Sequence, residues 1–334
     1  MNRERLKTGI IGAGGWGTAL AMVLAENHHQ TTLWTRSSDV ANEINQFHTN
    51  NIFLPDITIP SAIRATTNPS DLDDCDLLVI AVPTQYIRNI LKEYTFALAG
   101  KIIVSGAKGI ERHTLLRVSE ILDDATGITN SFAVLTGPSH AEEVARLMPT
   151  TVVAASTNSI IASKVQKAFT TSTFRVYSSP DVIGAELGGA LKNVIAIAAG
   201  IIDGVKMGDN TKAALITRGL SEMTRFGTAL GADAHTFSGL SGLGDLYVTC
   251  SSRHSRNRRV GEQIGSGISL AEILSGTQTV AEGVSTSESV YELSRKHGVE
   301  MPIVEQVYRI LFEGKSPRKA INDLMIRRAK PEQW

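Results

Sequence analysis

Short apolar runs and amphipathic segments alternate along the first half of the chain. Six nearly continuous apolar runs predict buried strands at residues 8–14, 31–36, 76–83, 101–108, 131–138 and 150–156. Helical patterns lie between some of them, at residues 16–28 and 85–94. Apolar strands that alternate with helices are typical of a parallel sheet covered on both faces. We therefore expect a doubly wound α/β sheet over residues 1–178.

The pattern changes after about residue 178, where no further strand-like run is evident. Segment 178–205 opens with serine, proline and aspartate, which predicts a helix with a serine cap and proline in its first turn. This helix is apolar on nearly all sides, so we expect it in the middle of a domain. Helical patterns follow at 211–230, 269–275, 284–297 and 301–313. Residues 179–334 are expected to form a second, all-helical domain.

The composition of the chain argues against several classes of protein. The chain has 334 residues with 33 basic and 33 acidic side chains, and this zero net charge argues against a protein devoted to binding nucleic acid. Its two cysteines, Cys75 and Cys250, support no disulfide framework and fit a cytoplasmic protein. No stretch approaches the roughly 18 apolar residues of a membrane span, so we expect no membrane insertion. No spacing of histidines or acids predicts a metal site.

A glycine motif lies between the first predicted strand and the helix that follows it. Gly12, Gly14 and Gly17 form G-x-G-x-x-G at the position where this motif binds a dinucleotide. The first glycine permits a tight turn, the second admits the pyrophosphate, and the third lets helix and strand pack closely. We therefore interpret the first domain as a Rossmann domain. A glycine-rich turn without a ligand is the alternative.

The end of the second predicted strand distinguishes the two nicotinamide cofactors. NAD sites usually place an acid there to hold the ribose 2′-hydroxyl. This chain instead has Arg36, and the next acid is Asp39. An arginine favours a 2′-phosphate, so we expect NADP to be preferred over NAD. An exposed arginine without a ligand is the other interpretation.

Three charged residues are candidates for catalysis. Lys108 lies at the C-terminal end of the predicted strand 101–108, at the edge of an open α/β sheet where ligands bind. Lys192 lies in the apolar helix, where an unpartnered lysine is costly, and Gly188 and Gly189 beside it would admit a close neighbour. Asp245 lies in a glycine-rich segment that we interpret as a loop. A lysine with a lowered pKa could deliver a proton during carbonyl reduction, a second cation could polarise the carbonyl, and the aspartate could orient the lysine.

The segment 250–262 gathers four arginines and a histidine between Arg253 and Arg259. Nucleic acid and a small phosphate ester are the two candidate ligands. The absence of aromatic residues between Tyr247 and Tyr291 weighs against single-stranded nucleic acid. Ser255 is a candidate N-cap, which would place Arg256 and Asn257 in a first helical turn that favours an anion. We expect Arg258 and Arg259 to be solvated or paired with acids such as Glu262.

The motifs together resemble the bacterial NAD(P)-dependent glycerol-3-phosphate dehydrogenase family over essentially the full length. They are GAGGWGTALA (12–21), AVPTQ (81–85), GAKGIE (106–111), LTGPSHAEEVA (135–145), ELGGALKNVIAIAAGIIDG (186–204), GLSGLGDLYVTC (239–250), SRNRRVG (255–261) and TVAEGV (279–284). The resemblance implies a Rossmann domain followed by a helical domain like that of 6-phosphogluconate dehydrogenase. It also implies reversible reduction of dihydroxyacetone phosphate to sn-glycerol 3-phosphate, which supplies glycerophospholipid synthesis.

The resemblance also implies roles for single residues. Lys192 would be the proton donor and acceptor, with Lys108 and Asp245 beside it. Further substrate positions would be Gly137, Ser139, Asn193, Thr249, Ser255, Arg256 and Asn257. Cofactor positions, besides the motif glycines, would be Gly15, Trp16, Arg36, Lys108, Ala141, Arg256, Val280 and Glu282, with Phe53 where many relatives have tyrosine.

Three other functions stay open at this point. Another carbonyl reductase or β-hydroxyacid dehydrogenase would carry a different loop in place of 255–259. A silent dinucleotide sensor would have lost Lys108 or Lys192, and a nucleic-acid binder would spread basic charge over a wider face. The oligomeric state is not determined by these patterns, although a homodimer is compatible with them.

Overall fold

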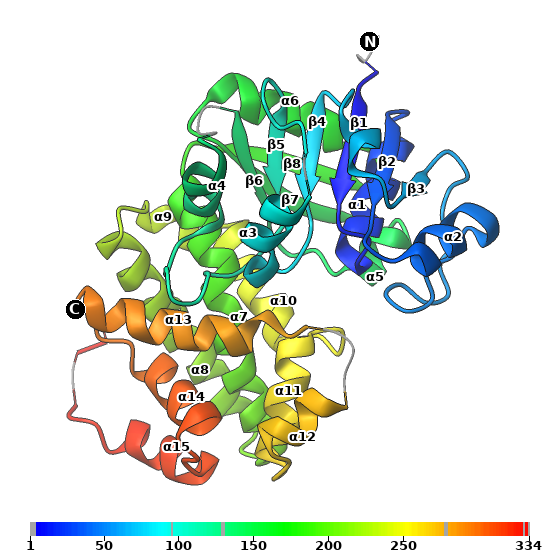
Figure 1. Ribbon diagram of the computed structural model, residues 1–334. Helices are drawn as coiled ribbons and strands as arrows, with labels where there is room; N and C mark the ends of the chain where they lie inside the picture. Colours follow the sequence, from blue (N-terminus) through cyan, green and yellow to red (C-terminus); the bar gives the residue numbers. More distant parts are fainter. Residues whose placement is uncertain (1–4, 95, 128–130, 277–279, 330, 333–334) are drawn as a thin grey trace.

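The first half of the chain forms one eight-stranded sheet with the order β3-β2-β1-β4-β5-β6-β7-β8 (Figure 1). The computed structural model describes residues 5–94, 96–127, 131–276, 280–329 and 331–332. The strands are β1 (Lys7–Ile11), β2 (Gln30–Trp34), β3 (Arg64–Thr66), β4 (Leu77–Ile80), β5 (Ile102–Ser105), β6 (Phe132–Thr136), β7 (Thr150–Ala155) and β8 (Phe174–Ser179). All six predicted strands are present, and the expected α/β sheet is confirmed.

Two separate apolar cores cover the two faces of the sheet. Successive strand residues point to opposite faces, so Ile10 joins the core under α1 and α6, while Ile11 joins the core under α3 and α4. This two-sided burial explains why the strands are continuous apolar runs. The connecting helices are α1 (Gly15–Glu26), α2 (Ser38–Phe47), α3 (Thr84–Glu93), α4 (Val118–Thr126), α5 (Ala141–Ala145) and α6 (Ser159–Phe169), with a short 3₁₀ turn η1 (Pro69–Leu72).

The sheet departs from the prediction at both edges. The pairing of β6 with β7 is antiparallel, so β7 and β8 run against the other six strands. A buried apolar run has the same pattern in either direction, and the pattern therefore did not reveal this reversal. The edge strands β3 and β8 were not predicted, because β3 has only three residues and β8 alternates buried and exposed positions. The serine cap predicted at 178–179 is also wrong, since these serines end β8.

The second half is helical, as predicted, and is built around one long buried helix, α7 (Val182–Gly204). Asp181 caps it by accepting a hydrogen bond from the Gly184 N–H at 2.8 Å. The other elements are α8 (Asp209–Ala229), α9 (Ala234–Ser238), the π turn η2 (Leu240–Gly244), α10 (Asp245–Ser251), α11 (Arg256–Gly265), α12 (Leu270–Ser275), α13 (Glu282–Lys296), α14 (Pro302–Phe312) and α15 (Pro317–Met325). Figure 1 shows α7 passing from the sheet into the centre of these helices.

Glycines bring α7 and α11 into backbone contact. A methyl group on Gly200 of α7 would lie 1.9 Å from the Arg258 carbonyl oxygen, and one on Gly261 of α11 would lie 2.0 Å from that of Ile197. Such distances exclude any side chain at these positions without separating the helices. The close packing places the first turn of α11 beside the middle of α7, where Lys192 and Asn193 lie.

Candidate functional site

A cavity of about 460 Å³ opens at the carboxyl ends of β1, β2, β4 and β5. The strand order reverses direction around β1, and ligands of open α/β sheets bind at such a switch point. The sheet contributes residues 12–16, 34–37, 81–83 and 106–107 to the walls. The helical half closes the cavity with Arg256, Val280 and Glu282. The cavity volume falls within the range of cofactor sites.

The motif glycines fit the three functions expected of them. Gly12 has a φ of +116°, which side chains rarely adopt. A methyl group on Gly17 would lie 1.9 Å from the Gly12 carbonyl oxygen, so helix and strand could not pack as they do. A methyl group on Gly14 would meet no atom within 4 Å, because this position faces the open cavity. Gly14 also begins α1 without a side-chain cap, which leaves N–H groups available for a pyrophosphate.

Other predicted cofactor residues lie around the same motif. Trp16 and Phe53 line the cavity, and Trp16 has a buried ring N–H with no partner in the described part of the chain. A methyl group on Gly15 would come within 2.7 Å of the Phe53 carbonyl oxygen and 3.7 Å of the Ala141 Cβ. Ala141 therefore borders the glycine turn, although it does not line the cavity.

Arg36 lies at one end of the cavity. This side chain is exposed at the carboxyl end of β2, and it lines the cavity beside Ser37. At the opposite side, the Glu282 carboxylate accepts hydrogen bonds from the N–H and the hydroxyl of Thr84, at 2.9 and 3.0 Å. This contact joins the first helical turn of α13 to that of α3, and so holds the two halves of the chain together across the cavity.

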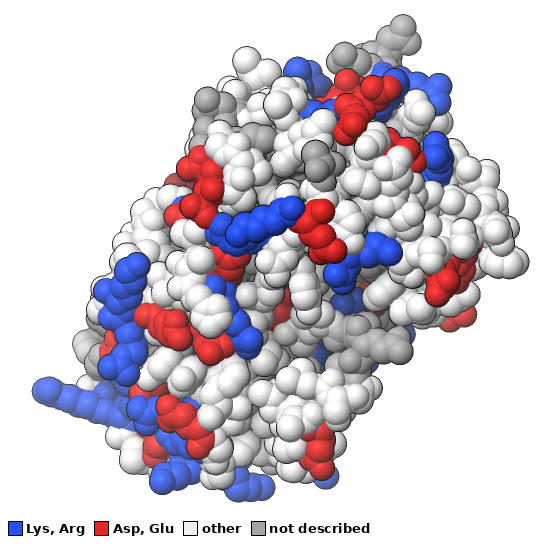
Figure 2. All heavy atoms as spheres, in the orientation of Figure 1, with Lys and Arg blue, Asp and Glu red and all other residues white. Residues whose placement is uncertain are grey.

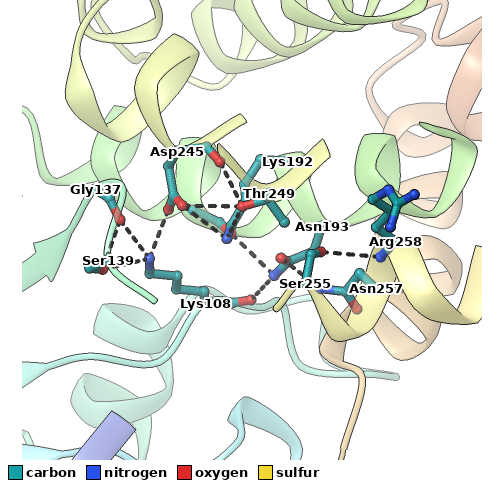
Figure 3. A network of polar contacts seen from close by, with 11 residues as sticks. Lys108, Gly137, Ser139, Lys192, Asn193, Asp245, Thr249, Ser255, Asn257 and Arg258 are labelled. Atoms are coloured by element: carbon teal, nitrogen blue, oxygen red, sulfur yellow. Dashed lines mark hydrogen bonds and ion pairs between the residues drawn. The ribbon is translucent and has the colours of Figure 1, made fainter. Parts of the chain in front are cut away.

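Lys108, Lys192 and Asp245 meet next to this cavity, although they come from three different elements. The Lys108 ammonium donates to Asp245 Oδ2 at 2.8 Å, and the Lys192 ammonium lies 3.0 Å from Oδ1. Figure 3 shows both lysine side chains pointing toward this carboxylate. Lys192 also donates to the Thr249 hydroxyl at 2.8 Å. The carboxylate thus bridges two cations in a buried setting.

Asp245 does not lie in a loop, as the sequence led us to expect. It is the first residue of α10 and follows the helical turn η2. Gly188 of α7 allows this turn to approach, since a methyl group there would lie 2.3 Å from the Ser241 carbonyl oxygen. The neighbouring Gly189 faces Thr136 and Lys108. The expected close approach at both glycines is therefore confirmed.

Burial and charge set the protonation of the cluster. Burial is the largest influence on Lys192 and lowers its pKa to about 8; Asp245 opposes this change and Lys108 adds to it. Burial disfavours the charged form of Asp245, but the two lysines outweigh it and hold the pKa of this carboxyl below its usual value. The cluster therefore contains a lysine able to exchange a proton near neutral pH beside a carboxylate whose charged form is favoured.

Gly137 and Ser139 adjoin Lys108. The Gly137 carbonyl accepts from the Lys108 ammonium at 3.0 Å and from the Ser139 hydroxyl at 2.8 Å. The Ser139 oxygen is itself 3.5 Å from the same ammonium. These contacts orient Lys108 toward the cluster from the end of β6.

Asn193 connects the cluster to α11. Its amide donates to the Lys108 carbonyl at 2.9 Å and its oxygen accepts from the Asn257 amide at 2.8 Å. The Asn257 oxygen accepts from the Gly283 N–H at 2.9 Å. The Asn257 side chain thus links α11 to α7 and to the start of α13.

The predicted N-cap at Ser255 is confirmed, since its hydroxyl accepts from the Arg258 N–H at 3.2 Å. Arg256 follows in the first turn, half-buried and facing the cavity. Arg258 forms ion pairs with Asp203 at 2.7 Å and with Glu262 at 3.3 Å. Because Arg258 is paired, the groups of this segment that border the cavity and, within the described chain, have a free positive charge or free N–H groups are Arg256 and the N-terminal backbone of α11.

Comparisons with known proteins agree with this geometry. Residues 7–162 match the model of the NAD-dependent glycerol-3-phosphate dehydrogenase N-terminus, and residues 181–322 match that of its C-terminus. The chain belongs to the NAD-dependent glycerol-3-phosphate dehydrogenase family. A curated relative in Salinibacter ruber, glycerol-3-phosphate dehydrogenase [NAD(P)+] 1, is 50% identical over 97% of this chain and 96% of its own. One in Lysinibacillus sphaericus, glycerol-3-phosphate dehydrogenase [NAD(P)+], is 49% identical over 98% of both.

A crystal structure of glycerol-3-phosphate dehydrogenase from Coxiella burnetii superposes with a TM-score of 0.92. It is 38% identical, and the match covers 97% of this chain and 99% of that one. The whole architecture of this dehydrogenase family member, sheet and helical half together, is therefore shared with a solved relative. NAD or NADP is the cofactor class that the family implies.

Surface charge, metal-ligating groups and apolar helices complete the description of this dehydrogenase family member. On the face in Figure 2, basic and acidic side chains are interspersed instead of forming a broad basic area. No group of metal-ligating side chains occurs among the described residues. Helix α7 is long and apolar enough to span a membrane by composition, but the apolar stretch is entirely buried inside the protein.

Some residues of the dehydrogenase site had not been identified from the sequence. Thr84 follows the run 76–83, and its position at a strand end is the signal that would have found it. Tyr86 lines the cavity two residues later. His140 lies near the charged cluster, where burial and the charge of Lys192 lower its pKa, and its ring is 5.8 Å from that of His254. No pattern in the sequence pairs these two histidines.

Proposed function

We propose that this protein reversibly reduces dihydroxyacetone phosphate to sn-glycerol 3-phosphate with NADPH or NADH. The observation that carries the proposal is the position of Lys192, between Asp245 and Thr249 and beside a cavity built for a dinucleotide. When bound, the dinucleotide supplies the hydride. Family membership supports the same reaction, because curated relatives carry that activity in their names.

Lys192 provides the proton in this proposal. As the carbonyl carbon gains a C–H bond, negative charge develops on its oxygen, and the Lys192 ammonium transfers a proton there. The N–H bond breaks, an O–H bond forms, and Lys192 is left neutral. A pKa of about 8 suits this step, since the neutral amine is then accessible in water near pH 7. In the oxidative direction the neutral amine accepts the hydroxyl proton.

Lys108 and Asp245 support the transfer. The Lys108 ammonium, held by Asp245 and Gly137, can donate to the developing oxyanion. Asp245 orients both lysines and compensates their charge. On the phosphate side, Arg256 and the first N–H groups of α11 offer charge-assisted hydrogen bonds to a dianion.

We further propose that NADP is preferred, because an arginine, Arg36, lines the cavity at the carboxyl end of β2, where NAD sites usually have an acid. Residues 1–178 would then be the dinucleotide-binding domain and 179–334 the catalytic domain, a division supported by the end of β8 at Ser179 and the start of α7 at Val182. We place the enzyme in the cytoplasm, where it would supply glycerophospholipid synthesis. Support comes from the two buried free thiols, Cys75 and Cys250. A homodimer is compatible with this proposal.

Initial rates with dihydroxyacetone phosphate, measured in parallel with NADPH and NADH, test the function. We expect turnover with both cofactors and a higher kcat/KM with NADPH. The Lys192→Ala variant should lose at least about 10²-fold in kcat, the low end of a general acid's contribution. Lys164→Ala, an exposed lysine on α6, is the matched control and should retain the parent rate. Near-normal turnover by the Lys192 variant would overturn the proposal.

A further inference from the structure

A second cavity, of about 520 Å³, lies in the helical half of the molecule. It is formed by α8, α14, α15 and the residues that follow α15, with Ile202 at the end of α7 as part of its wall. It shares no lining residue with the dinucleotide cavity. Figure 1 shows α14 and α15 at the end of the molecule away from the sheet. The reaction proposed above uses no residue of this cavity.

The walls of this cavity are aliphatic. The α8 wall repeats every three to four residues, at 211, 214, 215, 218, 222 and 225, so one face of the helix lines it. The opposite walls contribute Ile303, Ile321, Leu324 and Met325. None of the lining residues in the described part of the chain is aromatic. An aliphatic chain therefore suits these walls better than a nucleobase or another stacking ring.

Several charged groups at the cavity already have partners. Glu222 accepts hydrogen bonds from the N–H groups of Ile303 and Val304, at 2.8 and 3.4 Å, and so caps α14. Arg327 forms an ion pair with Glu300, whose carbonyl accepts from Arg225. These contacts define the shape of the cavity but leave these groups little capacity for a ligand.

Two other arginines that line the cavity have no such partners in the described part of the chain. Arg218 on α8 and Arg328 after α15 have no hydrogen bond or ion pair with any described residue. Glu332 is the one lining acid, among the described residues, in the same situation. The cavity therefore presents two unpaired guanidinium groups against one unpaired carboxylate, next to aliphatic walls. Guanidinium groups bind phosphate and carboxylate with paired hydrogen bonds.

We propose that this cavity binds a small amphipathic anion, with a phosphate or carboxylate head at Arg218 and Arg328 and an aliphatic tail along Ile303, Ile321 and Leu324. Its volume is that of a ligand pocket, and such pockets combine apolar walls with a few polar groups that orient the ligand. A head without a tail would leave the apolar walls in water. A tail without a head would leave the arginines without counter-charge.

Isothermal titration calorimetry with octyl phosphate, inorganic phosphate and 1-octanol tests the site on the full chain. We expect octyl phosphate to bind at least about tenfold more tightly than either fragment. Arg218→Gln and Arg328→Gln should each weaken it about tenfold, the effect of one charge-assisted hydrogen bond. Arg318→Gln is the matched control, because this arginine is exposed on α15 and lies outside the cavity. It should bind as the parent does.

The tail is tested separately with Met325→Ser, a side chain that is 77% exposed and so has little part in folding. This change should weaken octyl phosphate and leave inorganic phosphate unaffected. Equal affinities for octyl phosphate and inorganic phosphate overturn the proposal. The proposal is also overturned if octyl phosphate binding is lost in Arg256→Gln but kept in Arg218→Gln and Arg328→Gln, because octyl phosphate then binds at the substrate site. Sedimentation measures whether Arg218→Gln and Arg328→Gln break a dimer. If they do, and if octyl phosphate does not bind the parent, the proposal is wrong and this face binds a second copy of the chain.

Discussion

Asp245 is the only acid, among the described residues, that touches both Lys108 and Lys192, and replacing it by asparagine isolates the effect of its charge. Asparagine keeps the shape and can still accept one hydrogen bond. The two ammonium groups lose the carboxylate that balances them. Since Asp245 opposes the effect of burial on Lys192, its removal should lower the pKa of Lys192 below its present value of about 8.

The size of the change follows from the separation of the charges. Lys192 Nζ and Asp245 Oδ1 are 3.0 Å apart. Opposite unit charges at about 4 Å attract by roughly 4 kcal/mol at an effective dielectric constant of about 20. Each tenfold change in an acid dissociation constant corresponds to about 1.4 kcal/mol, so the constant of Lys192 should rise by up to about 10³-fold. At pH 7.5 the lysine of the variant is then mostly neutral and cannot donate a proton.

The pH dependence of kcat/KM for dihydroxyacetone phosphate measures this change, because it reports the ionisation of groups in the free enzyme. Reduction needs the protonated lysine, so the parent rate should fall as the pH rises through about 8. Oxidation of sn-glycerol 3-phosphate needs the neutral lysine, so its rate should fall as the pH decreases through the same value. In Asp245→Asn both of these changes in rate, the limbs of the two pH profiles, should occur at lower pH. Reduction at pH 7.5 should decrease by about 10² or more, and lowering the pH should recover part of it.

The matched control is Asp203→Asn. Asp203 also bridges two cations, Lys212 and Arg258, but it lies at the end of α7 away from Lys192. The Asp203→Asn variant should keep the limb of the pH profile near pH 8. The reasoning fails if Asp245→Asn loses activity equally at every pH, or if its limbs coincide with those of the parent. Circular dichroism of both variants separates lost ionisation from lost folding, since removing one partner of a buried ion pair can cost about 3–5 kcal/mol.

Three further predictions concern the cofactor, the buried carboxyl of α8 and the helix contact. Arg36→Asp should lower the ratio of kcat/KM with NADPH to that with NADH by about tenfold or more, and an unchanged ratio means that the 2′-phosphate is bound elsewhere. Burial raises the pKa of Glu222 to about 7 from 4.5, so its stabilising contribution is present at low pH and is lost as the pH rises through 7. We compare the free energy of unfolding by denaturant of Glu222→Gln with that of the parent at pH 5 and at pH 8. The difference between variant and parent should be about 2 kcal/mol more in favour of the variant at pH 8. An equal effect at both values excludes burial as the cause. Gly200→Ala places a methyl group 1.9 Å from the Arg258 carbonyl and should cost about 1–3 kcal/mol, whereas Gly276→Ala, with 3.6 Å of clearance, should be nearly neutral.

Local features of the fold could be predicted because each depends on a few neighbouring residues. The glycines at 12, 14 and 17 define a turn whatever surrounds it, and their position after a strand identified the dinucleotide cavity. Ser255 could be recognised as an N-cap for the same reason. The all-round apolar character of α7 predicted its burial. In each case the physical cause lies within about one helical turn or one strand.

The strand directions and the partners of charged residues could not be predicted in this way. The reversal of β7 and β8 depends on how the chain returns after α5, and a buried strand carries the same apolar pattern in both directions. No sequence pattern gave Asp203 a role, yet it forms an ion pair with Arg258, which makes this arginine less available to a phosphate. No sequence pattern predicted that the Asn257 side chain would connect Asn193 with Gly283.

From the sequence alone we could identify the class of the protein: a dinucleotide-binding sheet, a helical second half and the residues proposed to transfer a proton and bind a phosphate. This was possible because glycine turns, caps and periodic burial are local consequences of backbone geometry. The tertiary structure decided which of those residues act together. Lys108 follows β5, Lys192 lies in α7 and Asp245 begins α10, and only the packing of these elements brings two ammonium groups within 3.0 Å of one carboxylate. The second cavity has the same origin, because its walls and its two unpaired arginines come from helices that no local pattern places side by side.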